Sequence, residues 1–284
     1  MSLISTPELA ARLAADAPRL RLFDATVHLR PANPGPYTVE SGRADYEAAH
    51  IPTAAFADLS GELSDANSPL RFTLPPVAQL EAALSSLGLS NGDDCVVYSS
   101  TAPMWATRLW WMLRSLGFEA QVLDGGLTKW RAEGRAVAPG AERYPAGRFR
   151  AAPRAGLWAN QAEVLRSIGD GAVCMINALT AASHAGTAAT HYGRPGHIAG
   201  SVNVPYPSLL GADGAFKSAA ELRSTFETAG ALGKPRVICY CGGGISATMD
   251  ALALTLVGHR NVAVYDGSLS EWVLDPALPM ATGT

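Results

Sequence analysis

A chain of 284 residues with a net charge of -3 and 17% charged residues exceeds the usual size of one hydrophobic core, which favours two α/β domains. It contains no basic run, and neutralising phosphates needs clustered lysines and arginines, so we expect no nucleic-acid partner. No apolar stretch is long enough to span a bilayer, and the first residues lack the basic and apolar regions of a signal peptide. We therefore expect a cytoplasmic protein with no membrane partner.

The four cysteines, Cys95, Cys174, Cys239 and Cys241, are too few for a disulfide framework in a chain of this length. Cys239 and Cys241 form a Cys-x-Cys pair, which differs from the Cys-x-x-Cys of redox and zinc motifs, and no second pair completes a four-ligand site. We expect reduced thiols, no metal site and no cofactor.

The chain repeats one ordered set of segments, which indicates two domains of the same fold. The segments recur in the same order, 141 to 147 residues later. The pairs are 50–54 with 197–201, 96–100 with 237–241, 106–107 with 247–248, and 122–130 with 264–272. In this alignment the counterpart of Cys241 is Ser100.

Apolar strands alternate with helical stretches in each half. In the second half, residues 237–240 and 262–265 predict strands, and residues 247–257 predict a helix that Gly258 ends. This alternation is typical of an α/β fold in which helices flank a parallel sheet.

A linker is predicted at residues 141–153. This segment contains glycine, proline and charged residues but no long apolar period. We therefore expect one domain over residues 1–140 and a second over residues 154–284.

The position of Cys241 is favourable for chemistry, because it follows the strand at 236–240, and ligands gather at the carboxyl ends of parallel strands. Gly242, Gly243 and Gly244 come next and are followed by Ile245, Ser246 and a helix. Glycines let the backbone turn its N–H groups inward as a nest for an anion. The positive end of the helix lowers a thiol pKa, which predicts a nucleophile at neutral pH.

An alternative interpretation stays open at this point. Cys241 is equally well read as a small buried apolar residue, with the glycines forming only a tight turn. For Cys95, Cys174 and Cys239 this structural interpretation is the one we keep.

Residues 241–247 resemble the active loop of rhodanese and 3-mercaptopyruvate sulfurtransferase, in which a cysteine precedes a short glycine-containing loop. Residues 196–205 look like a second signature of that family, and residues 265–272 look like its C-terminal signature. The first half matches through His50-Ile51-Pro52, residues 108–111 and Asp124-Gly125-Gly126. The resemblance covers nearly the whole chain, with the motifs in the same order.

The resemblance implies two rhodanese-like domains that face each other, of which the C-terminal one is catalytic and the N-terminal one is not. Met104 and Trp105 of the first half would then line the cleft opposite Cys241, and plain core packing is the alternative for both. The implied reaction moves a sulfane sulfur from thiosulfate or 3-mercaptopyruvate through a Cys241 persulfide to cyanide or to a thiol acceptor such as thioredoxin. The amides of the loop would hold the charge that develops on sulfur.

The sequence departs from the family pattern in ways that leave the preferred donor open. Gly243 stands where relatives usually place a basic residue or a serine, and the arginines expected in residues 177–183 are missing. Arg194 is the best remaining cation for a sulfonate or carboxylate, with a solvated loop arginine as its alternative. His50 matches a histidine near the cleft of the mercaptopyruvate enzymes and is a candidate substrate ligand.

Two rival functions are a phosphatase, because some protein phosphatases share this fold and use a loop cysteine, and a module without turnover, which the missing arginines favour. A phosphatase of this fold needs a longer loop that ends in a phosphate-clamping arginine, whereas Ala247 and Thr248 follow Ser246 here. The other rival is a catalytically impaired, rhodanese-like module that binds sulfur or a protein partner.

Overall fold

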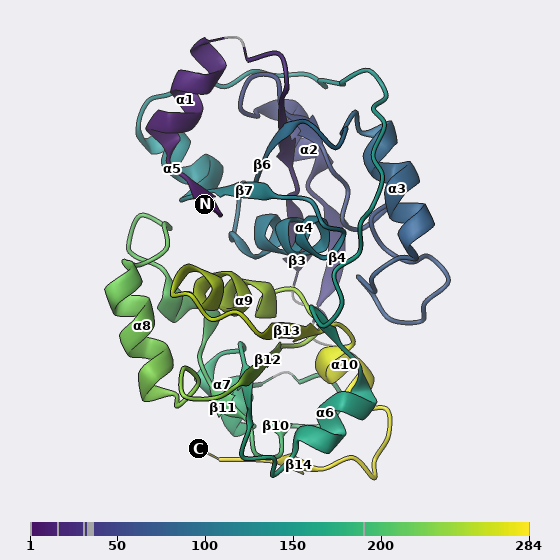
Figure 1. Ribbon diagram of the computed structural model, residues 1–284, viewed down its shortest axis with the longest axis vertical. Coiled ribbons are helices and arrows are strands. Elements are labelled where there is room, and N and C mark those ends of the chain that lie inside the picture. The colour runs from purple at the N-terminus through teal and green to yellow at the C-terminus, as the bar shows by residue number, and fades with distance from the viewer. Residues whose placement is uncertain (1, 16, 31, 33–36, 190, 284) are drawn as a thin grey trace.

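The two halves of the chain form two five-stranded parallel sheets, each flanked by helices (Figure 1). The computed structural model describes residues 2–15, 17–30, 32, 37–189 and 191–283. The first half contains β1 (Leu3–Ile4), α1 (Thr6–Ala14), β2 (Leu20–Asp24), β3 (Val27–Arg30), β4 (Thr38–Ser41), α2 (Arg43–Ala48), β5 (Ala55–Phe56), α3 (Val77–Ser86), β6 (Asp94–Tyr98), α4 (Met104–Ser115), β7 (Ala120–Leu123) and α5 (Gly126–Ala132). The second contains β8 (Trp158–Ala159), α6 (Gln161–Ser167), β9 (Val173–Asn177), α7 (Ala181–Ala185), β10 (His197–Ile198), β11 (Val202–Asn203), the 3-10 helix η1 (Tyr206–Leu209), α8 (Ala219–Thr228), β12 (Arg236–Tyr240), α9 (Ala247–Leu256), β13 (Val262–Tyr265), α10 (Ser268–Trp272) and β14 (Met280–Ala281).

Both sheets have the same strand order. The first runs β1-β7-β6-β2-β5, and the second, read from its own first strand, runs β8-β13-β12-β9-β11. Every pairing within these two sheets is parallel. The predicted α/β fold, with one parallel sheet in each half, is confirmed.

The middle strands β6 and β12 are apolar along almost their whole length. Four of the five residues are buried in each strand. A continuous apolar run is typical of a parallel strand that is covered on both faces. Because each is the middle strand of the same strand order, β6 and β12 end at equivalent places in the two sheets.

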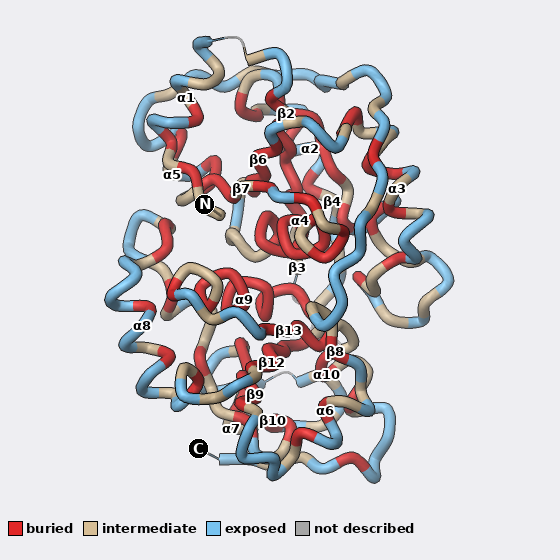
Figure 2. The backbone as a smooth tube through the Cα atoms, in the orientation of Figure 1, coloured by how far each residue is buried: buried red, intermediate tan, exposed pale blue. Residues whose placement is uncertain are grey.

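Two helices, α4 and α9, face each other between the sheets (Figure 1). Both are buried on nearly all sides (Figure 2). A helix that is apolar all round is stable only inside a core, so these two helices join the halves into one packed unit.

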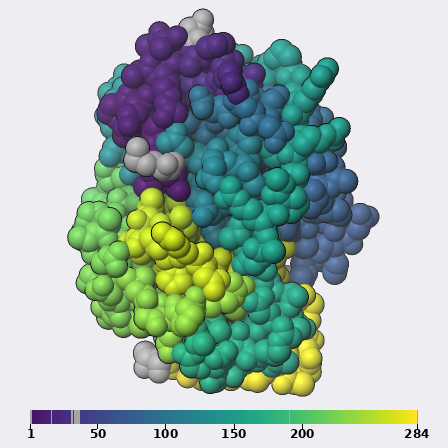
Figure 3. All heavy atoms as spheres, viewed as in Figure 1, coloured from purple at the N-terminus to yellow at the C-terminus, as the bar shows by residue number. Residues whose placement is uncertain are grey.

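The segment between α5 and β8 holds no helix or strand, and all of its residues are described. It nevertheless packs on the first half. Phe149 is buried against Phe118, and the amide of Ala152 donates to the carbonyl of Leu116 at 2.8 Å. In the space-filling view the teal atoms of the middle of the chain extend from the upper half to the lower half (Figure 3).

A short antiparallel hairpin, β3–β4, leaves the first sheet after β2. Tyr37 immediately precedes β4, and its hydroxyl reaches the Cys241 loop of the second half. The sequence patterns did not predict this hairpin.

Among the described residues, no helix combines the length and the apolar character that crossing a bilayer needs.

Candidate active site

Cys241 lies directly after β12, the middle strand of the second sheet. Its thiol is free and the residue is 2% exposed. Its amide donates to Ser268 Oγ at 3.1 Å, and the Ser268 hydroxyl donates to the Tyr265 carbonyl at 2.7 Å. Its carbonyl accepts from the amide of Leu269 at 3.1 Å. The start of α10 therefore fixes the backbone of the cysteine.

Ser268 adopts a left-handed backbone with φ of +48°, which strains a residue that has a side chain. Gly126 holds the same place at the start of α5 in the first half, with φ of +57° and no such cost. Unlike Gly126, Ser268 has a side-chain hydroxyl, and its oxygen accepts a hydrogen bond from the Cys241 amide. Local strain of this kind is typical of functional sites.

In the loop at residues 242–246, most backbone carbonyls accept hydrogen bonds, whereas the backbone amides donate none to any described residue. The Gly242 carbonyl accepts from the Ser270 amide at 2.8 Å, and those of Ile245 and Ser246 accept from the first turn of α9. In the part of the chain that the structure describes, none of the five loop amides donates a hydrogen bond. A run of unbonded amides beside a helix N-terminus suits an anion or a charged sulfur.

The three loop glycines differ in the space around them. A Cβ on Gly242 would collide with the ring of Tyr192. Gly244 has φ of +73°, and a Cβ there would lie 2.5 Å from the carbonyl oxygen of Asp266. A Cβ on Gly243 would meet no atom closer than 3.6 Å. Glycine is therefore required at 242 and 244 and not at 243.

Three tyrosines surround the loop. Burial, together with negative charge on Cys241, raises the pKa of Tyr37 to about 12. Burial also raises the pKa of Tyr192 and of Tyr206, with the same charge contributing. The rings of Tyr37 and Tyr192 meet edge to face with centroids 6.1 Å apart. These phenols stay neutral at ordinary pH.

Arg108 of α4 crosses from the first half to the active loop. It is buried, donating from Nη1 to the Gly244 carbonyl at 3.1 Å and from Nη2 to the Phe72 carbonyl at 2.6 Å. Nη2 also lies 2.7 Å from Asp266 Oδ1, and the guanidinium stacks over the Trp158 ring at 4.7 Å. A planar fork of donors suits several acceptors at once. Arg108 therefore ties the loop to both halves.

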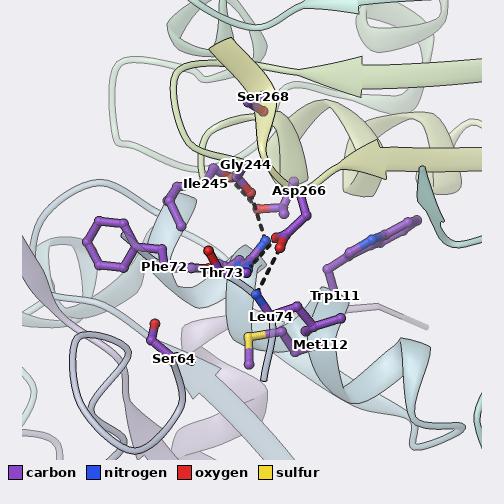
Figure 4. A network of polar contacts seen from close by, with 12 residues as sticks. Ser64, Phe72, Thr73, Leu74, Trp111, Met112, Gly244, Ile245, Asp266 and Ser268 are labelled. Atoms are coloured by element: carbon purple, nitrogen blue, oxygen red, sulfur yellow. Dashed lines mark hydrogen bonds and ion pairs between the residues drawn. The ribbon is translucent and has the colours of Figure 1, made fainter. Parts of the chain in front are cut away.

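The two halves exchange matching hydrogen bonds. The Leu74 amide of the first half donates to Asp266 Oδ2 of the second at 2.8 Å, and the Phe216 amide of the second donates to Asp124 Oδ1 of the first at 2.7 Å. Figure 4 shows Asp266 between Leu74 and Gly244. Burial raises the pKa of Asp124, and the Phe216 amide opposes that rise.

The structural counterpart of Cys241 is Ser99 and not Ser100, which corrects the alignment drawn from the sequence. The Ser99 carbonyl accepts from the Leu127 amide, as the Cys241 carbonyl accepts from the Leu269 amide. β6 also ends at Tyr98, as β12 ends at Tyr240. A serine holds the place in either alignment.

Met104 and Trp105 lie at the start of α4. Trp105 is buried and packs against Phe72 with ring centroids 5.2 Å apart, and Met104 is partly buried against the same core. Cys241 belongs to this apolar cluster too. The structure thus brings all three into one core.

His50 and Arg194 bond to backbone carbonyls of their own domains. His50 is fully buried, stacked on Tyr46, with Nδ1 2.9 Å from the Tyr46 carbonyl oxygen. Arg194 Nη1 donates to the carbonyls of Asp275 and Leu278 at 3.2 and 3.0 Å. Both side chains therefore hold their own domain together in this structure.

The other three cysteines are buried and free. Burial raises the pKa of Cys95, Cys174 and Cys239, so these remain protonated thiols. Across the described ranges, no three His, Cys, Asp or Glu side chains gather in a group that could hold a metal ion.

Sequence reasoning missed Arg108, Tyr37 and Tyr192. Arg108 carried one usable signal, because an arginine within the run from 104 to 113, whose other residues except Thr107 are apolar, must find buried partners. The two tyrosines carried none, since each reaches the loop from a segment distant in sequence.

Fold and site together define a class: a two-domain α/β protein with one cysteine at the carboxyl end of a middle strand, next to a loop of unbonded amides. The Rhodanese-like domain family matches residues 6–133 and 168–275, and the chain belongs to that family in two copies.

Named relatives match over nearly full length. A probable 3-mercaptopyruvate sulfurtransferase of Pseudomonas aeruginosa is 33% identical over 99% of this chain and 98% of its own. A thiosulfate sulfurtransferase of Rattus norvegicus is 33% identical over 95% and 91%. The crystal structure of SseA from Escherichia coli, a 3-mercaptopyruvate sulfurtransferase, is similar with a TM-score of 0.82 and 30% identity, over 94% of this chain and 99% of that one.

Proposed function

We propose that this protein is a sulfurtransferase that carries a sulfane sulfur as a persulfide on Cys241. The unbonded amides of residues 242–246 beside that thiol are the observation that carries the proposal. Similarity to thiosulfate and 3-mercaptopyruvate sulfurtransferases over nearly the whole chain supports it.

In the first step, the Cys241 thiolate attacks the outer sulfur of thiosulfate. A sulfur–sulfur bond forms to Cys241, the bond within the donor breaks, and sulfite leaves with the electron pair. With 3-mercaptopyruvate the carbon–sulfur bond breaks instead, and the enolate that leaves takes up the thiol proton to become pyruvate. Either donor yields the same persulfide.

In the second step, an acceptor attacks the terminal sulfur of the persulfide. Cyanide becomes thiocyanate, and a thiolate becomes a new persulfide, while Cys241 regains its thiolate. We propose a protein thiol such as that of thioredoxin as one acceptor class. The loop amides stabilise negative charge on either sulfur, since they are already oriented and have no other partner.

Intact mass spectrometry tests the proposal. Purified protein is incubated with thiosulfate, and separately with 3-mercaptopyruvate, before and after a reducing agent. We expect a gain of one sulfur atom that reduction removes and that Cys241→Ser never shows. Cys239→Ser is the matched control, because Cys239 is buried within β12, two residues before Cys241, and it should load like the wild type.

The second candidate is a binding module without turnover, which the 2% exposure of Cys241 favours. Failure of both donors to load the wild type would reject the enzyme and leave this module. Loading followed by release of sulfur to cyanide or to reduced thioredoxin would reject the module.

We also propose that the protein works in a reducing compartment, the cytoplasm. All four cysteines are free, including Cys239 and Cys241, which lie two residues apart. Paired cysteines would be expected in an oxidising compartment.

A further inference from the structure

The polar side chains around the active loop are almost all engaged. Ser270 Oγ donates to the Gly242 carbonyl at 2.8 Å, and Thr248 Oγ1 donates to the Ile245 carbonyl at 2.7 Å. The Arg108 guanidinium is already bonded to the carbonyls of Gly244 and Phe72 and to the carboxylate of Asp266. None of these groups is available to a sulfur donor.

Two phenols next to the loop are different. Tyr192 occupies the space that a Cβ on Gly242 would need, and Tyr37 Oη lies 3.6 Å from an ideal Cβ on Gly243. Within the described residues, neither hydroxyl makes a hydrogen bond. Their rings come from opposite halves of the chain and touch edge to face.

We propose that the hydroxyls of Tyr37 and Tyr192 bind the anionic group of the sulfur donor, so that neutral phenols from both domains do the work of a cationic side chain. The group bound is an oxyanion, either the sulfonate end of thiosulfate or the carboxylate of 3-mercaptopyruvate. The inference rests on the proposed sulfurtransferase function and identifies how its donor is held.

The chemistry of the phenols fits this role. Burial raises the pKa of both hydroxyls, so each keeps its proton and donates a hydrogen bond at neutral pH. The loop itself supplies amides for the sulfur, and the phenols stand beside it for the remaining charge. Hydrogen bonds to a charged acceptor are the strong ones, so two phenol hydroxyls can hold an oxyanion without a cation.

Arg71 places a cation beside Tyr37, with its guanidinium 5.7 Å from the centre of the Tyr37 ring. It is exposed and donates from Nη1 to the Tyr37 carbonyl at 3.1 Å. An exposed charge is screened by salt, so it contributes less than a hydrogen bond made inside the site.

The test measures the rate of sulfur loading for Tyr37→Phe and Tyr192→Phe with thiosulfate and with 3-mercaptopyruvate. Each substitution removes one hydroxyl and keeps the ring, and we expect about a tenfold slower loading for each. Tyr144→Phe is the matched control. Its hydroxyl accepts from the Leu22 amide in the first domain, and its loading should match the wild type. A loss with one donor only would assign the hydroxyl to that donor's oxyanion.

Two further readouts separate this inference from its rivals. Iodoacetamide is neutral, so alkylation of Cys241 should keep the wild-type rate in both tyrosine variants. Protection of Cys241 from iodoacetamide by pyruvate measures oxyanion binding without sulfur transfer, and half-protection should need about ten times more pyruvate in each variant. This readout decides the inference even if no donor loads the wild type.

Three results would overturn the proposal. The first is an equal loss of alkylation and of loading in the tyrosine variants, which would mean that the thiol itself had changed. The second is wild-type loading and protection in both variants. The third is about a tenfold loss in Arg71→Gln at 0.15 M salt with none in Tyr37→Phe, which would make recognition ionic.

Discussion

Thr107 and Thr248 meet across the two halves, with their Oγ1 atoms 2.7 Å apart in the buried core. They are 141 residues apart, and they are equivalent positions of the repeat. A residue that contacts its own counterpart marks the approximate two-fold axis of the molecule. This axis passes between α4 and α9, beside the active loop.

Replacing either threonine by valine should lower the free energy of unfolding by about 1–2 kcal/mol, because the remaining hydroxyl loses a buried partner. The double variant should lose less than the sum of the two single losses. Urea denaturation of all four proteins gives this double-mutant cycle. Strict additivity would show that the two hydroxyls do not interact.

Arg108→Met should lower the free energy of unfolding by about 3 kcal/mol or more, because it leaves Asp266 without its buried partner. It should also slow the loading of Cys241, since the carbonyl of Gly244 loses the donor that orients the loop. Urea denaturation and intact mass measure the two effects.

Arg114→Met is the matched control on the same helix. Arg114 is partly exposed and pairs loosely with the exposed Glu119 at 3.7 Å, so its loss should cost under about 1 kcal/mol. Equal costs for the two variants would contradict the role given to Arg108.

Alanine at the three loop glycines should have three different effects. Gly243→Ala should fold and load like the wild type, because its Cβ meets nothing closer than 3.6 Å. Gly242→Ala pushes on the Tyr192 ring, and Gly244→Ala combines a left-handed backbone with a clash against the Asp266 carbonyl. Thermal unfolding and loading rates should rank them 243, 242, 244. Inactivation by Gly243→Ala would refute this ranking.

Asp250 should make the protein less stable as pH rises. Its carboxyl is fully buried without a hydrogen-bond partner among the described residues, and burial raises its pKa well above the ordinary value. The folded state therefore keeps a proton that an unfolded aspartate loses above about pH 4. Stability falls with rising pH from there up to the folded pKa, by up to about 1.4 kcal/mol per pH unit.

Asp250→Asn removes this titration, so it should be more stable than the wild type at pH 7 and closer to it at pH 4. Urea denaturation between pH 4 and pH 8 measures both curves. Parallel curves would show that the carboxyl binds its proton equally in the folded and unfolded states.

The repeat, the two sheets and the position of Cys241 were predictable, because each follows from local apolar patterns and from the order of segments. The counterpart of Cys241 was not. The stretch from the strand tyrosine to the helix threonine is one residue longer in the first half, from Tyr98 to Thr107, than in the second, from Tyr240 to Thr248. An ungapped comparison therefore shifts the register by one.

The surroundings of the thiol were also beyond the sequence. Tyr37 arrives on a hairpin from the first domain, and Tyr192 arrives from a loop before β10. The side chains next to the loop depend on how the two domains pack. The spacing of apolar residues within one segment does not predict such a contact. Arg194 and His50 carried chemically suitable groups, yet both are bonded within their own domains.

The Leu74 amide donates to Asp266, and the Phe216 amide donates to Asp124. Two such matching hydrogen bonds have the form of a contact in a symmetric dimer, where one patch binds its own copy. In a true dimer any substitution is made twice. Covalent fusion removes that constraint, so the second half carries a cysteine where the first carries Ser99, and the first half contributes the Arg108 guanidinium to the loop of the second.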